Sequence, residues 1–166
     1  MSYDGRAVAN FILDFCDLKQ RKVTNLALQK IIYFCHARFL ADRNKPLVKH
    51  QFEAWQFGPV LQYVYRDFKM YDASPIASRA KGIDLLTGRI EIVGYDFDKS
   101  TKQFLESIVD FYSRLSASDL VDMSHATGGP WDQAWNHRGR VNPGMRIDNA
   151  AIQRYYSEVQ APFSLQ

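Results

Sequence analysis

The sequence predicts an all-α, single-domain fold of six or seven helices around a buried central helix (residues 24–44), with one small β-hairpin near residues 85–93. Three observations support this prediction. Apolar residues recur at helical spacing in most segments, one helix is apolar on nearly every side, and the interval from residue 72 to 98 is punctuated by glycine and proline. A chain of 166 residues fits one domain, residues 1–166, and buries roughly two-thirds of its unfolded surface.

The segment from Thr24 to Asn44 organises the prediction. One face carries apolar residues at i, i+3, i+4 and i+7, and a second face is also apolar, so this helix belongs inside with other helices around it. The two faces consist of Leu28, Ile31, Ile32, Cys35 and Phe39, and of Ala27, Phe34, Ala37 and Ala41. Thr24 is a preferred N-cap, Asn44 tolerates the left-handed C-cap, and Pro46 prevents continuation.

Two further segments flank this helix. Asp4 can cap a first helix, after which Lys19, Arg21 and Lys22 suit the negative C-terminal end. Residues 47–58 are aromatic and either extended or a helical turn. Proline is preorganised for the first turn of a helix, so we expect Pro59 to open the next one.

The interval 72–98 is the least helical. Leu85–Leu86 and Ile90–Val93, on either side of Thr87–Gly88, predict a β-hairpin. Two strands alone are marginally stable in water, so we expect this hairpin to lean on the helices.

The C-terminal half shows several helix starts and stops. Ser100 with Gln103, and Ser116 with Asp119, form capping boxes, the second opening a helix that runs to about His125. Glycine–glycine then ends that helix and proline begins a short turn with two tryptophans. The residues concerned are Gly128, Gly129, Pro130, Trp131 and Trp135, and Asp148 caps the last helix.

Composition and charge reduce the number of function classes that fit this sequence. A net charge of +3 falls short of the clustered basic residues of dedicated nucleic-acid binders. Cys16 and Cys35 lack CxxC spacing and lie among apolar neighbours, which is typical of reduced thiols in the cytoplasm. We find neither a signal peptide nor an apolar stretch long enough to span a membrane.

No group of residues predicts catalysis. Cys35–His36 and Ser124–His125 are sequence neighbours, whose side chains point about 100° apart on a helix, so neither is a ready nucleophile–base pair. Asp119, Asp122 and His125 share one helix face, but a cap, a surface carboxylate and a satisfied histidine explain them better than a metal. Phosphate-binding glycine motifs are absent. We therefore predict no enzyme, no cofactor and no metal.

Large amphipathic side chains exceed the needs of a core of this size, and Trp and Tyr are enriched among binding hot spots. The surplus comprises Trp55, Phe57, Tyr63, Tyr65, Tyr71, Trp131, Trp135, Tyr155 and Tyr156.

Three blocks carry a family resemblance. Asn25-Leu26-x-Leu28-Gln29-Lys30-x-x-Tyr33-Phe34 is similar to an NLxLQKLLYF signature. Glu53-Ala54-Trp55-x-x-Gly58-Pro59-Val60-x-x-x-Val64-Tyr65 resembles the second block, and His125 followed by Pro130-Trp131 resembles the third. In this order they resemble the SocA-like, or Panacea, antitoxin family, which has phage-associated members. The departures are Ser124, where threonine usually precedes the histidine, and residues 119–123, where an acidic-Leu-Ser pattern is common.

This resemblance implies an antitoxin that neutralises a cognate toxin, encoded nearby, by direct contact and without catalysis. The toxin would be covered or presented to a cellular protease. The candidate partner-binding residues are Gln29, Lys30, Tyr33, Trp55, Tyr65, His125 and Trp131. The first three lie on the polar stripe of a buried helix, so they either bond neighbouring backbone or line a groove, with Glu53 and His125 as candidate partners.

The alternative is a nucleic-acid-associated regulator encoded by a phage or mobile element. It depends on the basic balance and on the segments Lys19-Gln20-Arg21-Lys22 and Arg138-Gly139-Arg140. Binding of this kind weakens steeply with salt, because phosphate contacts release counterions.

Overall fold

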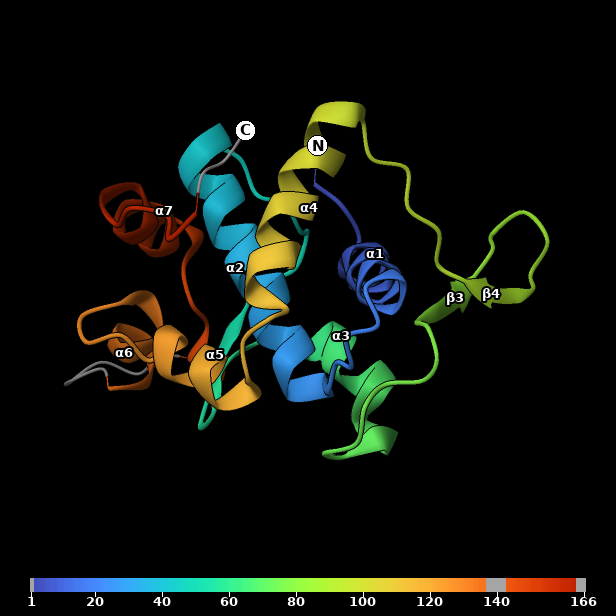
Figure 1. Cartoon of the computed structure of the whole chain (residues 1–166), viewed down its shortest axis with the longest axis horizontal. Helices are drawn as coiled ribbons and strands as arrows, with labels where there is room; N and C mark the ends of the chain where they lie inside the picture. The colour runs from blue at the N-terminus through green and yellow to red at the C-terminus, as the bar shows by residue number, and fades with distance from the viewer. Residues whose placement is uncertain (1, 137–142, 164–166) are drawn as a thin grey trace.

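The computed structural model describes residues 2–136 and 143–163. These residues form a mainly helical fold, as predicted, together with two separate two-stranded antiparallel sheets (Figure 1). The α-helices are α1 (Gly5–Leu18), α2 (Asn25–Arg43), α3 (Gln62–Phe68), α4 (Lys99–Tyr112), α5 (Ala117–Ser124), α6 (Pro130–Trp135) and α7 (Asn149–Glu158). The strands are β1 (Glu53–Trp55), β2 (Gly58–Val60), β3 (Lys81–Ile83) and β4 (Ile90–Ile92), and the short 3-10 helices are η1 (Lys69–Tyr71) and η2 (Pro143–Met145).

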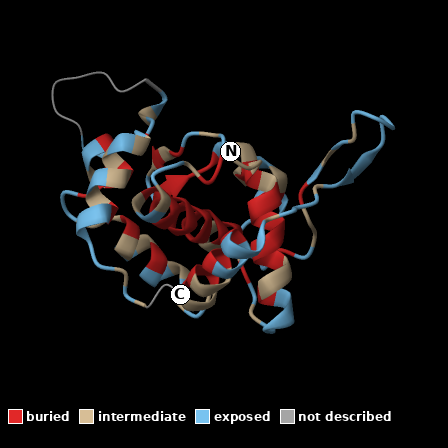
Figure 2. Ribbon diagram, turned by 90° about the horizontal axis from the view of Figure 1, so that it is seen from above, coloured by how far each residue is buried: buried red, intermediate tan, exposed pale blue. Residues whose placement is uncertain are grey.

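Helix α2 runs through the middle of the molecule, and α1, α3, α4, α5 and α7 all contact it (Figure 1). Every residue from 28 to 40 is buried (Figure 2). Its ends have the predicted caps. Thr24 accepts a hydrogen bond from the Ala27 amide at 3.2 Å, and Asn44 adopts the left-handed conformation with φ of 57°.

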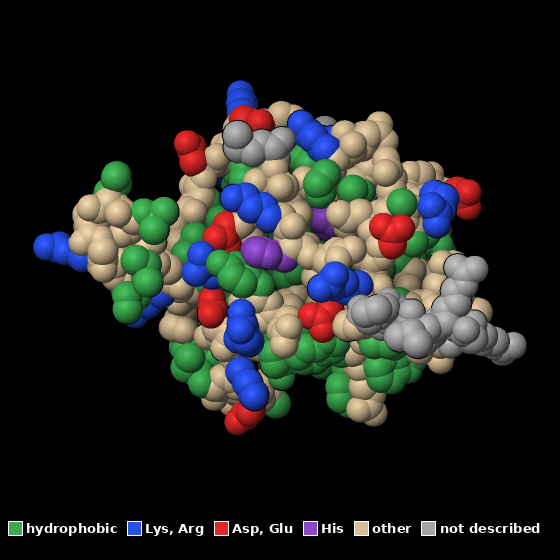
Figure 3. All heavy atoms as spheres, turned by 180° about the vertical axis from the view of Figure 1, so that it is seen from behind, with side chains coloured by type: hydrophobic (Ala, Val, Ile, Leu, Met, Phe, Trp, Pro, Cys, Tyr) green, Lys and Arg blue, Asp and Glu red, His purple; other side chains and the backbone are tan. Residues whose placement is uncertain are grey.

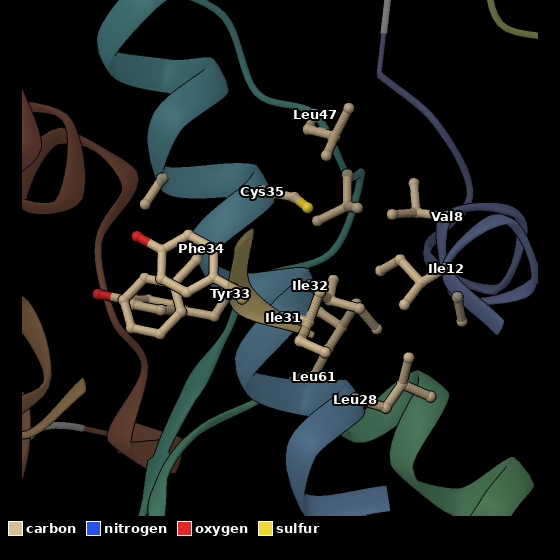
Figure 4. Close-up of a cluster of buried hydrophobic side chains, with 14 of the residues drawn as sticks. Val8, Ile12, Leu28, Ile31, Ile32, Tyr33, Phe34, Cys35, Leu47 and Leu61 are labelled. Atoms are coloured by element: carbon tan, nitrogen blue, oxygen red, sulfur yellow. The ribbon is translucent and has the colours of Figure 1, made fainter. Parts of the chain in front are cut away.

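The two apolar sides of α2 serve different neighbours (Figure 4). Leu28, Ile31 and Ile32 point toward Val8 and Ile12 of α1. The rings of Tyr33 and Phe34 point the other way, toward α7, where Tyr156 packs on both of them.

Buried polar side chains of α2 also hold its neighbours in place. The Nε2 atom of His36 lies 2.9 Å from Oδ1 of Asn149 at the start of α7, while its Nδ1 accepts from the Val48 amide at 3.3 Å. Arg38 donates to the carbonyl of Val159, just after α7, at 2.8 Å. Burial lowers the pKa of His36 to about 4, so the ring is neutral at pH 7.

The segment after α2 forms a hairpin rather than a helix start. Strands β1 and β2 pair with Glu53 opposite Val60 and Trp55 opposite Gly58. The prediction that Pro59 opens a helix was wrong, because α3 begins only at Gln62. The reason is tertiary: side chains of α2 bond the backbone of residues 59–61 and hold it extended.

The second hairpin has a different register from the predicted one. Strand β4 falls where expected, but its partner is β3, and Leu85 and Leu86 lie in the turn with 96% and 97% of their surface exposed. Asn10 of α1 sets this register, because its amide accepts from the Ala80 N–H at 2.8 Å and donates to the Val93 carbonyl at 2.9 Å. In the described part of the chain, the hairpin meets the body near this base and projects beyond it (Figures 1 and 2).

The other helix caps that the sequence predicted can be compared with the structure. Asp4, Ser116 and Asp148 cap their helices as predicted. The predicted capping box at Ser100 was wrong, because the Asp98 carboxylate accepts from the Thr101 amide at 2.7 Å and Ser100 instead accepts from Arg43. Both cysteines are buried free thiols. Among the described helices, none combines the length and apolar character needed to cross a bilayer.

Candidate partner-binding site

Six of the seven predicted site residues lie in one connected network around the β1–β2 hairpin. Helix α2 contributes two of them beneath the hairpin, and β1, α3, the end of α5 and α6 contribute one each. They are Gln29, Lys30, Trp55, Tyr65, His125 and Trp131. The network has a buried polar layer and a partly exposed aromatic layer.

Gln29 is the first member of the buried layer and has no exposed surface. Its Oε1 accepts from the Leu61 amide at 2.9 Å, and its Nε2 donates to Asn25 at 3.0 Å. Asn25 in turn donates to the Tyr65 carbonyl at 3.1 Å. A side chain on α2 therefore satisfies backbone and polar groups that would otherwise be buried without partners.

Lys30 is the second member, and it too is fully buried. Its ammonium donates to the Pro59 carbonyl at 2.8 Å. Burial lowers the pKa of Lys30 from 10.5 to about 7, because the charged form loses its hydration. The predicted partners of these polar groups, Glu53 and His125, do not bond them: Glu53 accepts from the Trp55 indole and His125 stacks on Trp131.

Gly58 fits closely over this layer. Its φ of +112° is a conformation that side-chain-bearing residues rarely adopt, and an added Cβ would lie 2.5 Å from Cε of Lys30 and 2.6 Å from Oγ of Ser124. The glycine of the second sequence block is thus required by both backbone conformation and space.

The aromatic layer covers the hairpin. Trp55 meets Tyr65 edge to face at a centroid distance of 4.9 Å, and the Trp131 indole donates to the Trp55 carbonyl at 2.8 Å. Trp131 stacks on His125 at 3.7 Å and on Trp135 at 5.8 Å. Trp131 is buried and Trp135 is 39% exposed, so the stack runs from the interior to the surface.

His125 is neutral in this setting. Burial lowers its pKa and the charge of Lys30 lowers it further, against opposing effects from Asp122 and Asp132. Its Nε2 is buried and makes no hydrogen bond to the described residues. The ring therefore contributes a flat stacking face at pH 7 rather than a positive charge.

Two exposed aromatic residues of this surface were missing from the predicted site. Trp135 extends the stack, and Phe57, 58% exposed, lies at the turn of the hairpin that carries Trp55. Both belonged to the surplus of large side chains in the sequence. Trp131 and Trp135 are also four residues apart, which places them on the same face of a helix. We name Trp55, Phe57, Tyr65, His125 and Trp135 the aromatic surface.

Tyr33 is the predicted residue that lies apart from the network. It has no exposed surface and packs edge to face against Phe34, Phe52 and Tyr156. Burial raises the pKa of its hydroxyl. In this conformation it belongs to the contact between α2 and α7.

The described residues offer no metal site, since no three histidine, cysteine or carboxylate side chains among them gather closely enough to hold an ion. The basic segment after α1 is partly used internally, because Arg21 bonds Asp110 at 2.9 Å. Residues Arg138, Gly139 and Arg140 lie outside the described residues. On the rear face, basic and acidic side chains are interspersed (Figure 3).

Fold and site together define a mainly helical protein that presents aromatic side chains above a buried polar layer, and Trp and Tyr are the residue types enriched in protein-binding hot spots. The chain belongs to the SocA-like, Panacea-domain antitoxin family. The family model described as "Antitoxin SocA-like, Panacea domain" matches residues 28–132. Antitoxin SocA of Caulobacter vibrioides (strain NA1000 / CB15N) is 44% identical over 152 residues, which cover 91% of this chain and 81% of that protein.

The resemblance based on the three sequence blocks is therefore confirmed. No solved structure matches the chain significantly.

Proposed function

We propose that this protein is the antitoxin of a toxin–antitoxin system and that it neutralises a cognate toxin, encoded nearby, by direct binding. The observation that carries the proposal is the 44% identity to a protein named Antitoxin SocA across 91% of this chain. A cytoplasmic location is part of the proposal, and the two reduced, buried cysteines support it.

The proposed contact region is the aromatic surface together with Trp131. The residues of the aromatic surface are partly exposed, and the buried Trp131 orients them from beneath by bonding Trp55 and stacking on His125. Hot spots cluster centrally around such aromatic anchors. Gln29 and Lys30 are fully buried, which supports a role beneath the contact region rather than in it. Tyr33 is also fully buried, in the contact between α2 and α7, and lies outside the proposed region.

Neutralisation in this proposal needs neither catalysis nor a cofactor. The buried polar groups below the aromatic surface are engaged with backbone: Lys30 bonds the Pro59 carbonyl and Gln29 bonds the Leu61 amide. A group held in this way positions structure and is not presented to a substrate.

Two modes of neutralisation are compatible with direct contact. In the first, the antitoxin covers the working surface of the toxin, and the cellular amount of toxin stays constant. In the second, it presents the toxin to a cellular protease, and the half-life of the toxin shortens when the antitoxin is present. Pulse-chase measurement of the toxin in cells with and without the antitoxin separates the two.

The deciding experiment expresses the adjacent open reading frame alone and then together with this protein. We expect growth arrest in the first case and rescue in the second. A harmless neighbour, or toxicity that this protein does not relieve, would count against the antitoxin function.

Variants then locate the contact. Trp135→Ala and Tyr65→Ala should each weaken toxin binding by at least ~2 kcal/mol, about 30-fold in Kd, if they are hot spots. Met70→Gln is the control, because Met70 is 73% exposed on η1, outside the aromatic surface. Circular dichroism and thermal melting of each variant must match the parent before lost binding is assigned to the contact.

A further inference from the structure

The projecting β3–β4 hairpin turns its apolar face away from the body. Ile83, Ile90 and Ile92 share one face and are 66%, 71% and 58% exposed. The opposite face carries Gly82, where an added Cβ would meet the Arg6 guanidinium of α1 at 2.9 Å. The hairpin therefore rests its glycine side on the protein and shows its isoleucine side to the surroundings. Figure 3 shows hydrophobic side chains on this projection.

Strand β4 also has an open edge. The bonds from the Asp84 amide to the Arg89 carbonyl, at 2.8 Å, and from the Val93 amide to the Ala80 carbonyl, at 3.0 Å, fix which residues face β3. In an antiparallel pair inward and outward residues alternate, so the backbone groups of Ile90 and Ile92 point outward.

Among the described residues β4 pairs with β3 alone. The outer edge of β3 is partly occupied, because Arg6 donates to the Lys81 carbonyl at 3.1 Å. Unpaired edges of this kind are templates for another strand.

The sequence of β4, with Arg89 just before it, indicates which strand can pair with the open edge. If Ile90 lies opposite Ile90 of a second copy in antiparallel orientation, Arg89 of each copy faces Glu91 of the other. This register uses the outward backbone groups of Ile90 for mutual hydrogen bonds. It also places the isoleucines of both hairpins in one cross-strand row, Ile83 and Ile90 from each copy, on the same face of a four-stranded sheet.

Other registers fit less well. With Glu91 opposite Glu91, like charges would meet directly, and the backbone groups of that residue already face Gly82 of β3. Centring the pair on Ile92 sets Glu91 against Val93 and leaves both charges without partners. Complementary charge thus selects a single register.

We propose that β4 is a self-association edge and that a second copy of this chain is its occupant, forming a two-fold symmetric dimer through β4–β4 pairing. A two-fold axis brings the same surface of both copies together, as the Arg89–Glu91 exchange requires. Three partly exposed isoleucines on one hairpin offer far less apolar area than the ~800 Å² per partner of a standard stable interface. The dimer is therefore weak and dependent on concentration. This proposal is independent of toxin binding, which we place on the aromatic surface.

Sedimentation equilibrium of the full chain over increasing concentration tests the proposal. We expect the parent to dimerise, and Arg89→Glu and Glu91→Arg each to weaken dimerisation by about tenfold or more, since each variant sets two like-charge pairs across the axis. Mixing the two variants should restore dimers, because every charge introduced in one copy then faces its opposite in the other.

The mixture also removes a confounding effect. Arg89 lies opposite Asp84 within its own hairpin, so Arg89→Glu could weaken dimerisation by loosening the hairpin itself. The Arg89→Glu copy in the mixture carries the same loosened hairpin. Dimers that return in the mixture therefore show that the charges between the two copies, and not the loosening, caused the loss. Lys102→Glu, an exposed reversal on α4, serves as the control and should leave association unchanged. A parent that stays monomeric up to ~1 mM, dimers insensitive to both reversals, or a mixture that stays monomeric would each overturn the proposal.

Discussion

The two hairpins of this protein have strands of equal length, three residues each, and opposite surroundings. All three residues of β2 are buried, although they are a glycine, a proline and a valine. All three residues of β4 are exposed, although two of them are isoleucines. Side-chain hydrophobicity alone would assign these surroundings the other way round.

The difference lies in what satisfies the backbone. The chain around β2 is bonded by Lys30 and Gln29, which α2 directs at Pro59 and Leu61, so it can be buried without losing hydrogen bonds. Among the described residues, Asn10 and Arg6 bond the second hairpin near its base. In this protein the strand that is buried is the one whose neighbouring backbone groups receive hydrogen bonds from another element. Apolar side chains in a strand are not enough to bury it.

The largest expected effect contrasts a glycine in each hairpin. Gly58→Ala should lower the free energy of unfolding by about 4 kcal/mol, because strain at positive φ adds to the overlap with Lys30 and Ser124. Gly88→Ala, at a φ of +70° with no atom within 4 Å, should cost only about 1 kcal/mol. Urea denaturation of both variants measures the pair. Equal losses would contradict the difference we draw between the hairpins.

The next effect is the pH dependence conferred by Lys30. In the unfolded chain its pKa is 10.5, and burial lowers it to about 7 in the fold, so the unfolded chain binds more protons between these values. Stability supplied by this group therefore rises with pH above 7, by about 1.4 kcal/mol per pH unit.

Stability measured at pH 7 and pH 9 for the parent and Lys30→Met isolates this contribution. Buried thiols and phenols with raised pKa values act in the opposite direction in both proteins, so the difference between them is the informative quantity. The parent should gain about 2 to 3 kcal/mol relative to the variant over this interval. A difference that does not change with pH would mean that Lys30 is not buried as a titrating group.

A smaller effect concerns the base of the projecting hairpin. Asn10→Ala should cost about 2 kcal/mol, because the Ala80 amide and the Val93 carbonyl lose their buried partner. Hydrogen exchange should accelerate in residues 80–93 more than elsewhere. Tyr95→Phe is the control: it removes an exposed hydrogen bond to Asp14 and should cost less than about 1 kcal/mol. Unchanged exchange in Asn10→Ala would show that another contact sets the register.

The smallest effect is expected at the tip of the same hairpin. Leu85→Ser should change stability by no more than about 0.5 kcal/mol, because the side chain is 96% exposed. Val60→Ala in β2, where the side chain is 4% exposed, should cost about 1 to 2 kcal/mol. Thermal melting of both variants measures the two losses. A large loss at Leu85 would mean that the hairpin packs against the body.

In the candidate site, too, the sequence predicted which residues take part, and the tertiary structure decided how they are arranged. The three sequence blocks predicted seven candidate residues, and six of these are connected in the structure. Whether Gln29 and Lys30 lined a groove or bonded backbone depended on where residues 59–61 lie, some 30 positions away in the chain. Trp135 and Phe57 were visible only as part of an aromatic surplus, because exposure is a property of the assembled surface.

The sequence by itself determined the helical class, the family and the N-terminal caps of four helices. Thr24, Asp4, Ser116 and Asp148 bond amides two or three residues away, and such bonds form whatever the rest of the chain does. The tertiary structure decided the extended path at Pro59 and the register of β3 with β4. Both depend on side chains far along the chain, Lys30 for the first and Asn10 for the second. No local pattern of residues records where a distant hydrogen-bond partner will lie.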